Sequence, residues 1–185
     1  MEHKRALLIA TNLLNDLLPF CERAEIAGSV RRQKPEVKDI EIVVIPKMRK
    51  VLDMFGSDSG FVSELQEKMP YLLGYWNAYT IKNGEKYKQI SLNEHFIKLD
   101  LFIVNVETWG YQLAIRTGPA DYSHWLVTPK KYGGALHSYA RIENARVIVN
   151  GKPIQTREEE EFFDFLDLPT LAPEKRAAPN GFKTK

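Results

Sequence analysis

The sequence predicts an α+β fold, in which helices and strands are grouped along the chain and do not strictly alternate. Three observations predict it: an amphipathic helical pattern opens the chain, most strand patterns lie before residue 104, and helical patterns resume from residue 107. At roughly 150 residues per domain, the 185 residues suffice for one domain or for two small lobes around a shared cleft.

The composition excludes several classes of protein. The longest apolar run, at 40–46, is far shorter than the roughly 18 residues that a membrane helix needs. Cys21 is the only cysteine, which excludes an internal disulfide framework and a cysteine-based zinc site. The N-terminus lacks the pattern of a signal peptide. We therefore expect an intracellular, cytoplasmic protein that has no membrane partner.

The first elements follow from leucine spacing and from β-branched residues. Leucines at helical spacing predict a helix over 4–18, which Pro19 ends. A short strand is expected over 23–30, with Gly28 and Ser29 at its end, and a second, rich in Ile and Val, over 37–45.

The middle of the chain predicts two helices and three strands. Residues 46–55 and 61–69 have helical patterns, with a loop at 56–60 between them. The expected strands cover 71–79, 86–92 and 95–104.

The last part of the chain combines helices with a short hairpin. Helical patterns extend from 107 to about 130, with a break at 117–119. Strand patterns at 136–142 and 146–149 precede the hairpin signal Asn150-Gly151. Thr156 is predicted to cap a last helix that carries the acidic turn 157–160.

The change of pattern near 105 predicts two lobes. The larger N-terminal lobe covers 1–105, a smaller α+β lobe covers 106–176, and 177–185 is expected to be a flexible tail because it is rich in Pro, Gly and Lys.

The net charge of +2 neither demands nor forbids a nucleic-acid partner. Eight Lys or Arg face four Asp or Glu between 23 and 50, whereas 157–167 holds six acids and one base. A basic patch beside an acidic surface can bind phosphates. Scattered, solvated charge accounts for the same counts equally well.

Three acids have the pattern that phosphoryl transfer requires. Asp39 and Glu41 are two residues apart on one predicted strand, so their side chains point to the same face. Asp100 lies on a later apolar strand. Hard cations prefer carboxylate oxygens, and two divalent ions about 3.5–4 Å apart serve many phosphoryl transfers. Alternating acids usually form a solvated face, but Asp39 and Glu41 interrupt a run of Ile and Val.

The segment Gly28-Ser29 with Arg31 and Arg32 adds a candidate phosphate site. Backbone N–H groups near Gly28 and the Ser29 hydroxyl can donate to a triphosphate. Either Arg31 or Arg32 can neutralise charge on its β and γ phosphates. Gly-Ser after a strand is more often only a turn. Here it occurs together with the three acids, and Gly28 precedes Asp39 by eleven residues, a combination that chance alone does not readily produce.

These motifs together resemble the family X DNA polymerases, which are nucleotidyltransferases of the DNA polymerase β type. Ala27-Gly28-Ser29-Val30-Arg31-Arg32 looks like the family's G-S-x-R-R motif, and Asp39-Ile40-Glu41 with Asp100 looks like its acid triad. The sequences 116–119 and 162–176 are similar to the family's nucleotide-holding segment and thumb. The resemblance covers about 5–176 and implies a minimal palm (1–105) followed by a thumb (106–176).

The resemblance implies roles for individual residues. Asp39, Glu41 and Asp100 would be catalytic and would bind two Mg²⁺ or Mn²⁺ ions. The nucleotide-binding residues would be Gly28, Ser29, Arg32, Arg116, Thr117 and Gly118. The family pattern implies a DNA contact at Lys98, and the thumb adds candidate phosphate contacts at Lys130, Lys131, Arg141 and Arg146.

The expected function is the metal-dependent addition of nucleotides from a (d)NTP to a DNA 3′-OH, as in template-directed gap filling during DNA repair. The expected partners are gapped or primer-template DNA and a (d)NTP, and the expected state is a monomer. Alternatives are a template-independent or ribonucleotide-adding terminal transferase, a small-molecule or protein nucleotidylating enzyme, and a non-catalytic nucleic-acid-binding protein.

Overall fold

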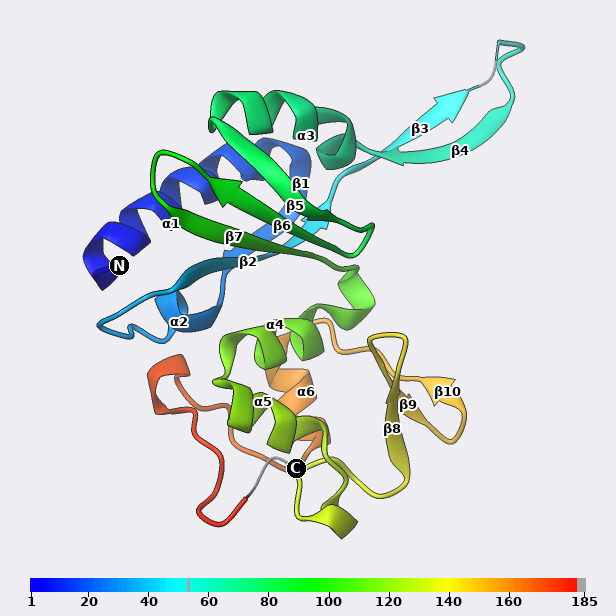
Figure 1. Cartoon of the computed structure of the whole chain (residues 1–185). Coiled ribbons are helices and arrows are strands. Elements are labelled where there is room, and N and C mark those ends of the chain that lie inside the picture. Colours follow the sequence, from blue (N-terminus) through cyan, green and yellow to red (C-terminus); the bar gives the residue numbers. More distant parts are fainter. Residues whose placement is uncertain (53, 183–185) are drawn as a thin grey trace.

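A five-stranded mixed sheet forms the larger lobe (Figure 1). The computed structural model describes residues 1–52 and 54–182. The strand order is β1-β2-β7-β6-β5, with β2 and β7 parallel and the other neighbours antiparallel. The strands are β1 (Cys21–Ile26), β2 (Asp39–Pro46), β5 (Ala78–Asn83), β6 (Tyr87–Leu92) and β7 (Ile97–Ile103). Together with the helices below, this sheet confirms the α+β class.

Two helices, α1 (His3–Leu17) and α3 (Glu64–Tyr75), cover one face of this sheet (Figure 1). Side chains alternate along a strand, so Ile40, Ile42 and Val44 all point to that face and are buried there. The same alternation places Asp39 and Glu41 on the opposite face. The face of β2 that carries Ile40, Ile42 and Val44 therefore belongs to the core. The acids on its other face remain available for a site.

The C-terminal lobe contains helices and a second, small antiparallel sheet. Its own core is built from buried aromatic and aliphatic side chains such as Tyr111, Tyr122 and Phe162. Its helices are η2 (Val106–Thr108), α4 (Trp109–Thr117), α5 (Ala120–Val127), η3 (Lys130–Tyr132), α6 (Glu159–Phe165) and η4 (Pro173–Lys175). Its strands are β8 (Ala140–Glu143), β9 (Arg146–Val149) and β10 (Lys152–Pro153).

A third apolar cluster joins the two lobes. Val43 and Phe102 of the large sheet pack with Trp109 and Leu113 of α4. Helix α4 therefore covers the apolar end of the face that carries the acids at its other end. The predicted division at 105 remains a prediction, because the two parts share this buried contact.

The predicted helix at 46–55 is wrong. Residues there form a hairpin of β3 (Met48–Leu52) and β4 (Asp58–Ser63), which projects from the body of the molecule (Figure 1). Arg49 lies opposite Val62 and Lys50 opposite Phe61 in this hairpin, and the predicted loop at 56–60 contains Gly56 and Gly60 with positive φ angles. The helix prediction failed because the strands of a hairpin are stabilised by their pairing with each other across the turn, which a local sequence pattern does not show.

The predicted boundary between a helix at 61–69 and a strand at 71–79 is also wrong. Helix α3 begins after Ser63, whose Oγ accepts the Gln66 N–H, and continues through Pro70 to Tyr75. Leu65, Met69 and Leu72 are buried at helical spacing. Tyr71 and Tyr75, which the predicted strand included, lie on the exposed side of the helix.

Smaller differences concern element ends. The strand expected at 23–30 ends at Ile26, and α2 (Gly28–Arg31) follows. The strand expected at 136–142 is reduced to β8, which begins at Ala140. Glu158, and not Thr156, is the N-cap of α6, because Thr156 pairs through its backbone with Glu107 and Gly110. Residues 177–182 are irregular, and the rest of the predicted tail, 183–185, lies outside the described residues.

Candidate active site

The three predicted acids are brought together by the parallel pairing of β2 and β7. In this register Glu41 lies opposite Asp100, and Asp39 lies opposite Lys98. Asp39 and Glu41 share a face because they are two residues apart on β2. Two carboxylates on neighbouring strands and a third two residues away thus form one acidic group, although about 60 residues separate them in sequence.

Two carboxyl groups of this acidic group, those of Glu41 and Asp39, have raised pKa values. Burial and the nearby Asp39 raise the pKa of Glu41 to about 7. Burial and the charge of Asp100 raise the pKa of Asp39 as well. A carboxylate with a raised pKa binds protons more readily because its charged form is poorly solvated. Bound cations would relieve this repulsion, so the group has the electrostatics of a cation site.

Two side chains orient Asp100, and the sequence analysis missed both. The Tyr87 hydroxyl and the Gln89 amide donate to Asp100 Oδ1 at 2.7 and 3.0 Å. Burial and the hydrogen bond to Asp100 raise the pKa of Tyr87 to about 12, so it stays a donor. The sequence alone shows that Tyr87 and Gln89 are two residues apart. The pairing of Gln89 with Asp100 appears only in the sheet register.

Gly28 allows the acids and α2 to approach each other. Its φ is +60°, and a Cβ added there would lie 1.7 Å from Glu41 Oε2. The backbone is also joined at this point, because Ala27 N–H donates to Glu41 O at 2.8 Å. A glycine is therefore required both for the left-handed conformation and for the contact with the carboxylate.

Ser29 and Arg32 carry buried polar atoms that lack partners. Ser29 Oγ and Arg32 Nε form no hydrogen bond with any other described residue. Both residues line a hollow of about 500 Å³ together with Asp39, Lys34 and Lys38. Burial lowers the pKa of Arg32, while Glu41 and Asp39 oppose that shift. Unpartnered buried donors are costly, so this hollow is suited to a ligand rich in acceptor oxygens.

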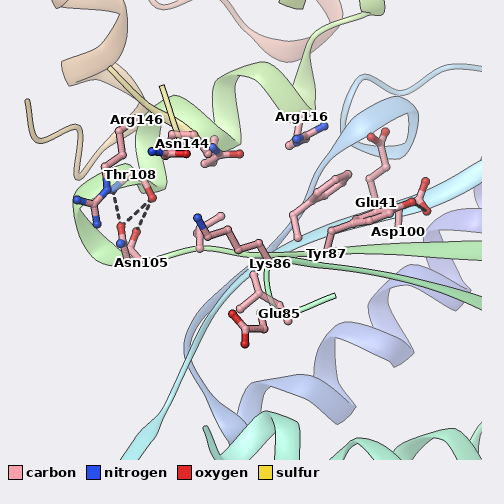
Figure 2. Close-up of a pocket in the computed structure, with 15 residues that line it drawn as sticks. Glu41, Glu85, Lys86, Tyr87, Asp100, Asn105, Thr108, Arg116, Asn144 and Arg146 are labelled. Atoms are coloured by element: carbon pink, nitrogen blue, oxygen red, sulfur yellow. Dashed lines mark hydrogen bonds between the residues drawn. The ribbon is translucent and has the colours of Figure 1, made fainter. Parts of the chain in front are cut away.

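A larger cavity of about 710 Å³ opens on the other side of the acids. Figure 2 shows Arg116 above Tyr87, between the acids and the turn that carries Asn144 and Arg146. The Arg116 guanidinium lies 4.1 Å from the centre of the Phe102 ring, and its Nε is buried without a hydrogen bond to the described part of the chain. Lys86, Asn144 and Arg146 also line this cavity. The sequence analysis named Arg146 as a candidate phosphate contact of the thumb, but neither Lys86 nor Asn144 as a site residue.

Thr117 and Gly118 lie next to the phosphate-site candidates. Arg32 donates to Thr117 O at 2.5 Å, and Arg31 donates to Thr117 Oγ1 at 2.7 Å. Gly118 is closely packed, since a Cβ there would lie 2.7 Å from Tyr122 Cδ1. The structure thus brings Thr117 and Gly118 of one lobe next to the segment 28–32 of the other, whereas Arg116 lines the larger cavity.

The predicted DNA contacts are more dispersed. Lys98 is exposed beside Asp39 on the acidic face. Arg141 pairs with Glu143 at 2.9 Å and lines a separate hollow that also includes Lys86 and Arg146. Lys130 pairs with Asp167 at 3.3 Å, and neither Lys130 nor Lys131 lines the cavities described above.

The acids have the donor chemistry of a Mg²⁺ or Mn²⁺ site, but they do not form a complete set of ligands. No group of three or more His, Cys, Asp or Glu side chains among residues 1–52 and 54–182 is arranged to hold a metal ion. Glu41 packs against Gly28, and Asp100 accepts hydrogen bonds from Tyr87 and Gln89. The three carboxylates supply the hard oxygen ligands that these cations prefer.

The comparisons with known proteins identify no family. No protein-family model matches the chain, and no curated protein matches its sequence. In the described residues no helix has both the length and the apolar character to cross a membrane.

Proposed function

We propose that this protein is a Mg²⁺- or Mn²⁺-dependent nucleotidyltransferase that adds nucleotides from a (d)NTP to a DNA 3′-OH and releases pyrophosphate. The observation that carries the proposal is that Asp39 lines the same hollow as the unpartnered donors of Ser29 and Arg32, while Glu41, which pairs with Asp100, lies against the adjoining Gly28. Acids that suit cations and donors that suit phosphate oxygens are the two parts that nucleotidyl transfer needs. Template-directed gap filling is the form of the reaction that we propose.

The chain's own residues have the following roles in this proposal. Ser29 and Arg32 bind the triphosphate, and Arg116 binds the nucleotide from the side of the larger cavity. Asp39, Glu41 and Asp100 hold the two divalent cations, whose chemistry is to neutralise charge on the phosphates and to lower the pKa of the attacking hydroxyl. Tyr87 and Gln89 hold Asp100 in place. Positioning and charge neutralisation supply most of the rate in such reactions.

Extension of a labelled DNA primer tests the proposal. Paired, gapped and single-stranded primers are incubated with each dNTP and each NTP in Mg²⁺ or Mn²⁺. We expect extension of gapped DNA that EDTA abolishes and that Asp100→Asn reduces by about a hundredfold or more, the scale on which one electrostatic group contributes. Asp164→Asn, an exposed acid on α6, is the matched control and leaves the rate unchanged.

Other outcomes of this assay identify the alternatives. Untemplated addition would show a terminal transferase, and preference for NTPs would show a ribonucleotide-adding enzyme. No extension under any condition would contradict the proposal and would favour a binding role or another acceptor.

Binding of the cations can be measured without the reaction. Mg²⁺ or Mn²⁺ is expected to raise the Tm, because a ligand bound at 100 times its Kd stabilises the folded state by about 2.7 kcal/mol. Asp39→Asn is expected to remove most of this shift, whereas Asp164→Asn retains it. An equal shift in both variants would place the cations elsewhere.

A further inference from the structure

A buried ion cluster lies outside the acidic site. Glu159, the first residue of α6, has 6% of its surface exposed, and Arg176 has 4%. Arg176 Nη1 donates to Glu159 Oε1 at 2.6 Å. Arg31 donates to both Glu159 oxygens at 3.0 Å. One carboxylate therefore receives two guanidinium groups. Removing it is costly because Arg176 would remain buried without its partner and the half-buried Arg31 would lose its bidentate contact.

The cluster joins three parts of the chain that are distant in sequence. Arg31 belongs to α2, Glu159 to α6, and Arg176 to the segment that follows η4. Arg31 also donates to Thr117 Oγ1, at the end of α4. The bidentate geometry of Arg31 on Glu159 fixes the direction of its side chain as well as its distance.

Helix α2 depends on such outside contacts. It has only four residues, and within the described chain its N-cap, Ala27, makes no side-chain capping bond. A helix of one turn is unstable by itself, so packing and ion pairs decide its position. Gly28, Ser29 and Arg31 belong to α2, and Arg32 follows directly. The contact that holds Arg31 thus also orients its neighbours in the proposed triphosphate site.

The charges of the cluster suit its role in holding Arg31 and thereby α2. Burial would raise the pKa of Glu159, but hydrogen bonds from Arg176 and Arg31 hold it below its usual value. Glu159 is therefore ionised at neutral pH and pairs with both guanidinium groups. Glu25 Oε2 lies 3.9 Å from Arg31 Nη2 and adds a second carboxylate beside Arg31.

We propose that Glu159 and Arg176 are positioning residues for the nucleotide-binding segment 28–32. They hold Arg31, and through it they set the orientation of Ser29 and Arg32, without contacting the nucleotide themselves. The proposal rests on the proposed function for its consequence, which is that the C-terminal segment determines nucleotide affinity. Its structural part, the ordering of α2, can be measured independently of any reaction.

Glu159→Gln and Arg176→Gln test the proposal, with Glu160→Gln as the matched control. Glu160 is the next residue of the same helix and is exposed. We expect KM for the nucleotide to rise about tenfold or more in both test variants and kcat at saturation to change by less than about threefold. The acids Asp39, Glu41 and Asp100 lie on β2 and β7 and make no contact with the cluster in the structure, so the chemical step is retained.

Hydrogen exchange supplies a readout that does not need activity. The Arg31 and Arg32 amides donate to Ala27 O and Gly28 O, and we expect their exchange to become at least about tenfold faster in Glu159→Gln. Amides of β2 serve as the internal reference. All measurements are made well below the Tm of each variant, and Arg176→Lys, which retains the charge, provides a milder test if Glu159→Gln fails to fold.

The outcomes separate this proposal from the proposed function. Unchanged KM together with unchanged exchange at Arg31 and Arg32 would overturn it. Equal loss of kcat in all variants, with no change in KM, would also overturn it, because that result indicates a general loss of folded protein. Faster exchange confined to 28–32 in a protein that binds no nucleotide would support the positioning of α2 and contradict the proposed function.

Discussion

At the scale of single residues, Gly28 is the described glycine that tolerates a side chain least. It combines a φ of +60° with a contact to Glu41 that leaves no room for a Cβ. Sequence patterns identified the glycine as part of a motif, and the structure supplies the physical reason. A side chain at this position would displace either α2 or the Glu41 carboxylate, and both belong to the proposed site.

We expect Gly28→Ala to be more damaging than an alanine at another left-handed glycine. Gly133→Ala is the matched control, because Gly133 has a φ of +83° and no described atom lies within 4 Å of its added Cβ. Both variants incur about 1–2 kcal/mol for the left-handed backbone. Gly28→Ala adds about 1–3 kcal/mol for overpacking and abolishes nucleotide addition. Urea unfolding and primer extension measure the two effects, and equal stability of the two variants would contradict the contact.

The Glu159 carboxylate is expected to stabilise the fold in a pH-dependent manner. Its pKa is held below the usual 4.5 in the folded state. A group of this kind contributes stability above its unfolded-state pKa and loses that contribution as the pH falls through the folded-state pKa. The free energy of unfolding of the native protein should exceed that of Glu159→Gln by about 3 kcal/mol near neutral pH. The difference should shrink below about pH 4.5, and urea unfolding at pH 7 and pH 4 would measure it.

At the scale of elements, two turns face the larger cavity from opposite lobes. Lys86 lies in the turn between β5 and β6, and Arg146 begins β9 after the turn from β8. Both residues are exposed and line the cavity beside Asp100. Under the proposed function, their position between the lobes favours Lys86 and the predicted Arg146, over the predicted Lys130 and Lys131, as contacts for the phosphates of a DNA strand.

Binding of gapped DNA at several salt concentrations distinguishes these two sets. We expect Lys86→Ala and Arg146→Ala to weaken binding and each to reduce the slope of log K against log[salt] by about 1. Lys131→Ala, the control, should have little effect because Lys131 does not line the cavity. A larger effect of Lys131→Ala would return the DNA contact to the surface that the sequence predicted.

At the scale of the whole molecule, the two lobes are joined by close packing as well as by charge. A Cβ added to Gly110 of α4 would lie 1.9 Å from Glu158 O, just before α6. The Gly110 N–H donates to Thr156 O at 2.7 Å. Arg23 of β1 pairs with Glu158 at 2.7 Å and lies over the Trp109 ring. The position of α6, and with it Glu159, therefore depends on the absence of a side chain at residue 110.

We expect alanine to have opposite effects at two helical glycines. Gly74→Ala in α3 should stabilise the protein by up to about 1 kcal/mol, because alanine is the better helix former and no described atom lies within 4 Å of the new Cβ. Gly110→Ala should destabilise it by about 1–3 kcal/mol through overpacking. Thermal unfolding measures both, and stabilisation by Gly110→Ala would contradict the close approach of α4 and the start of α6.

Local patterns predicted much of the fold. The helix that begins the chain, the strand with Asp39 and Glu41, and the last helix all follow from spacings within a few residues. The hairpin at 48–63 and the start of α6 at Glu158 were missed because they depend on partners outside the local window. Among the site residues, the acids and the Gly-Ser segment were predicted as a motif. Tyr87, Gln89 and Glu159 were missed because only their partners reveal what they do.

The sequence by itself determined the α+β class, the shared face of Asp39 and Glu41 and the residue types of the candidate site, since strand alternation and composition are local properties. Only the tertiary structure decided that Glu41 lies beside Asp100, that Arg32 faces the hollow and that Arg31 is bound to Glu159 and, through it, to Arg176. The Glu41–Asp100 and Arg31–Glu159 pairings join residues about 60 and 128 positions apart. The free energy of burying charge and apolar surface selects them, and it depends on the whole fold at once.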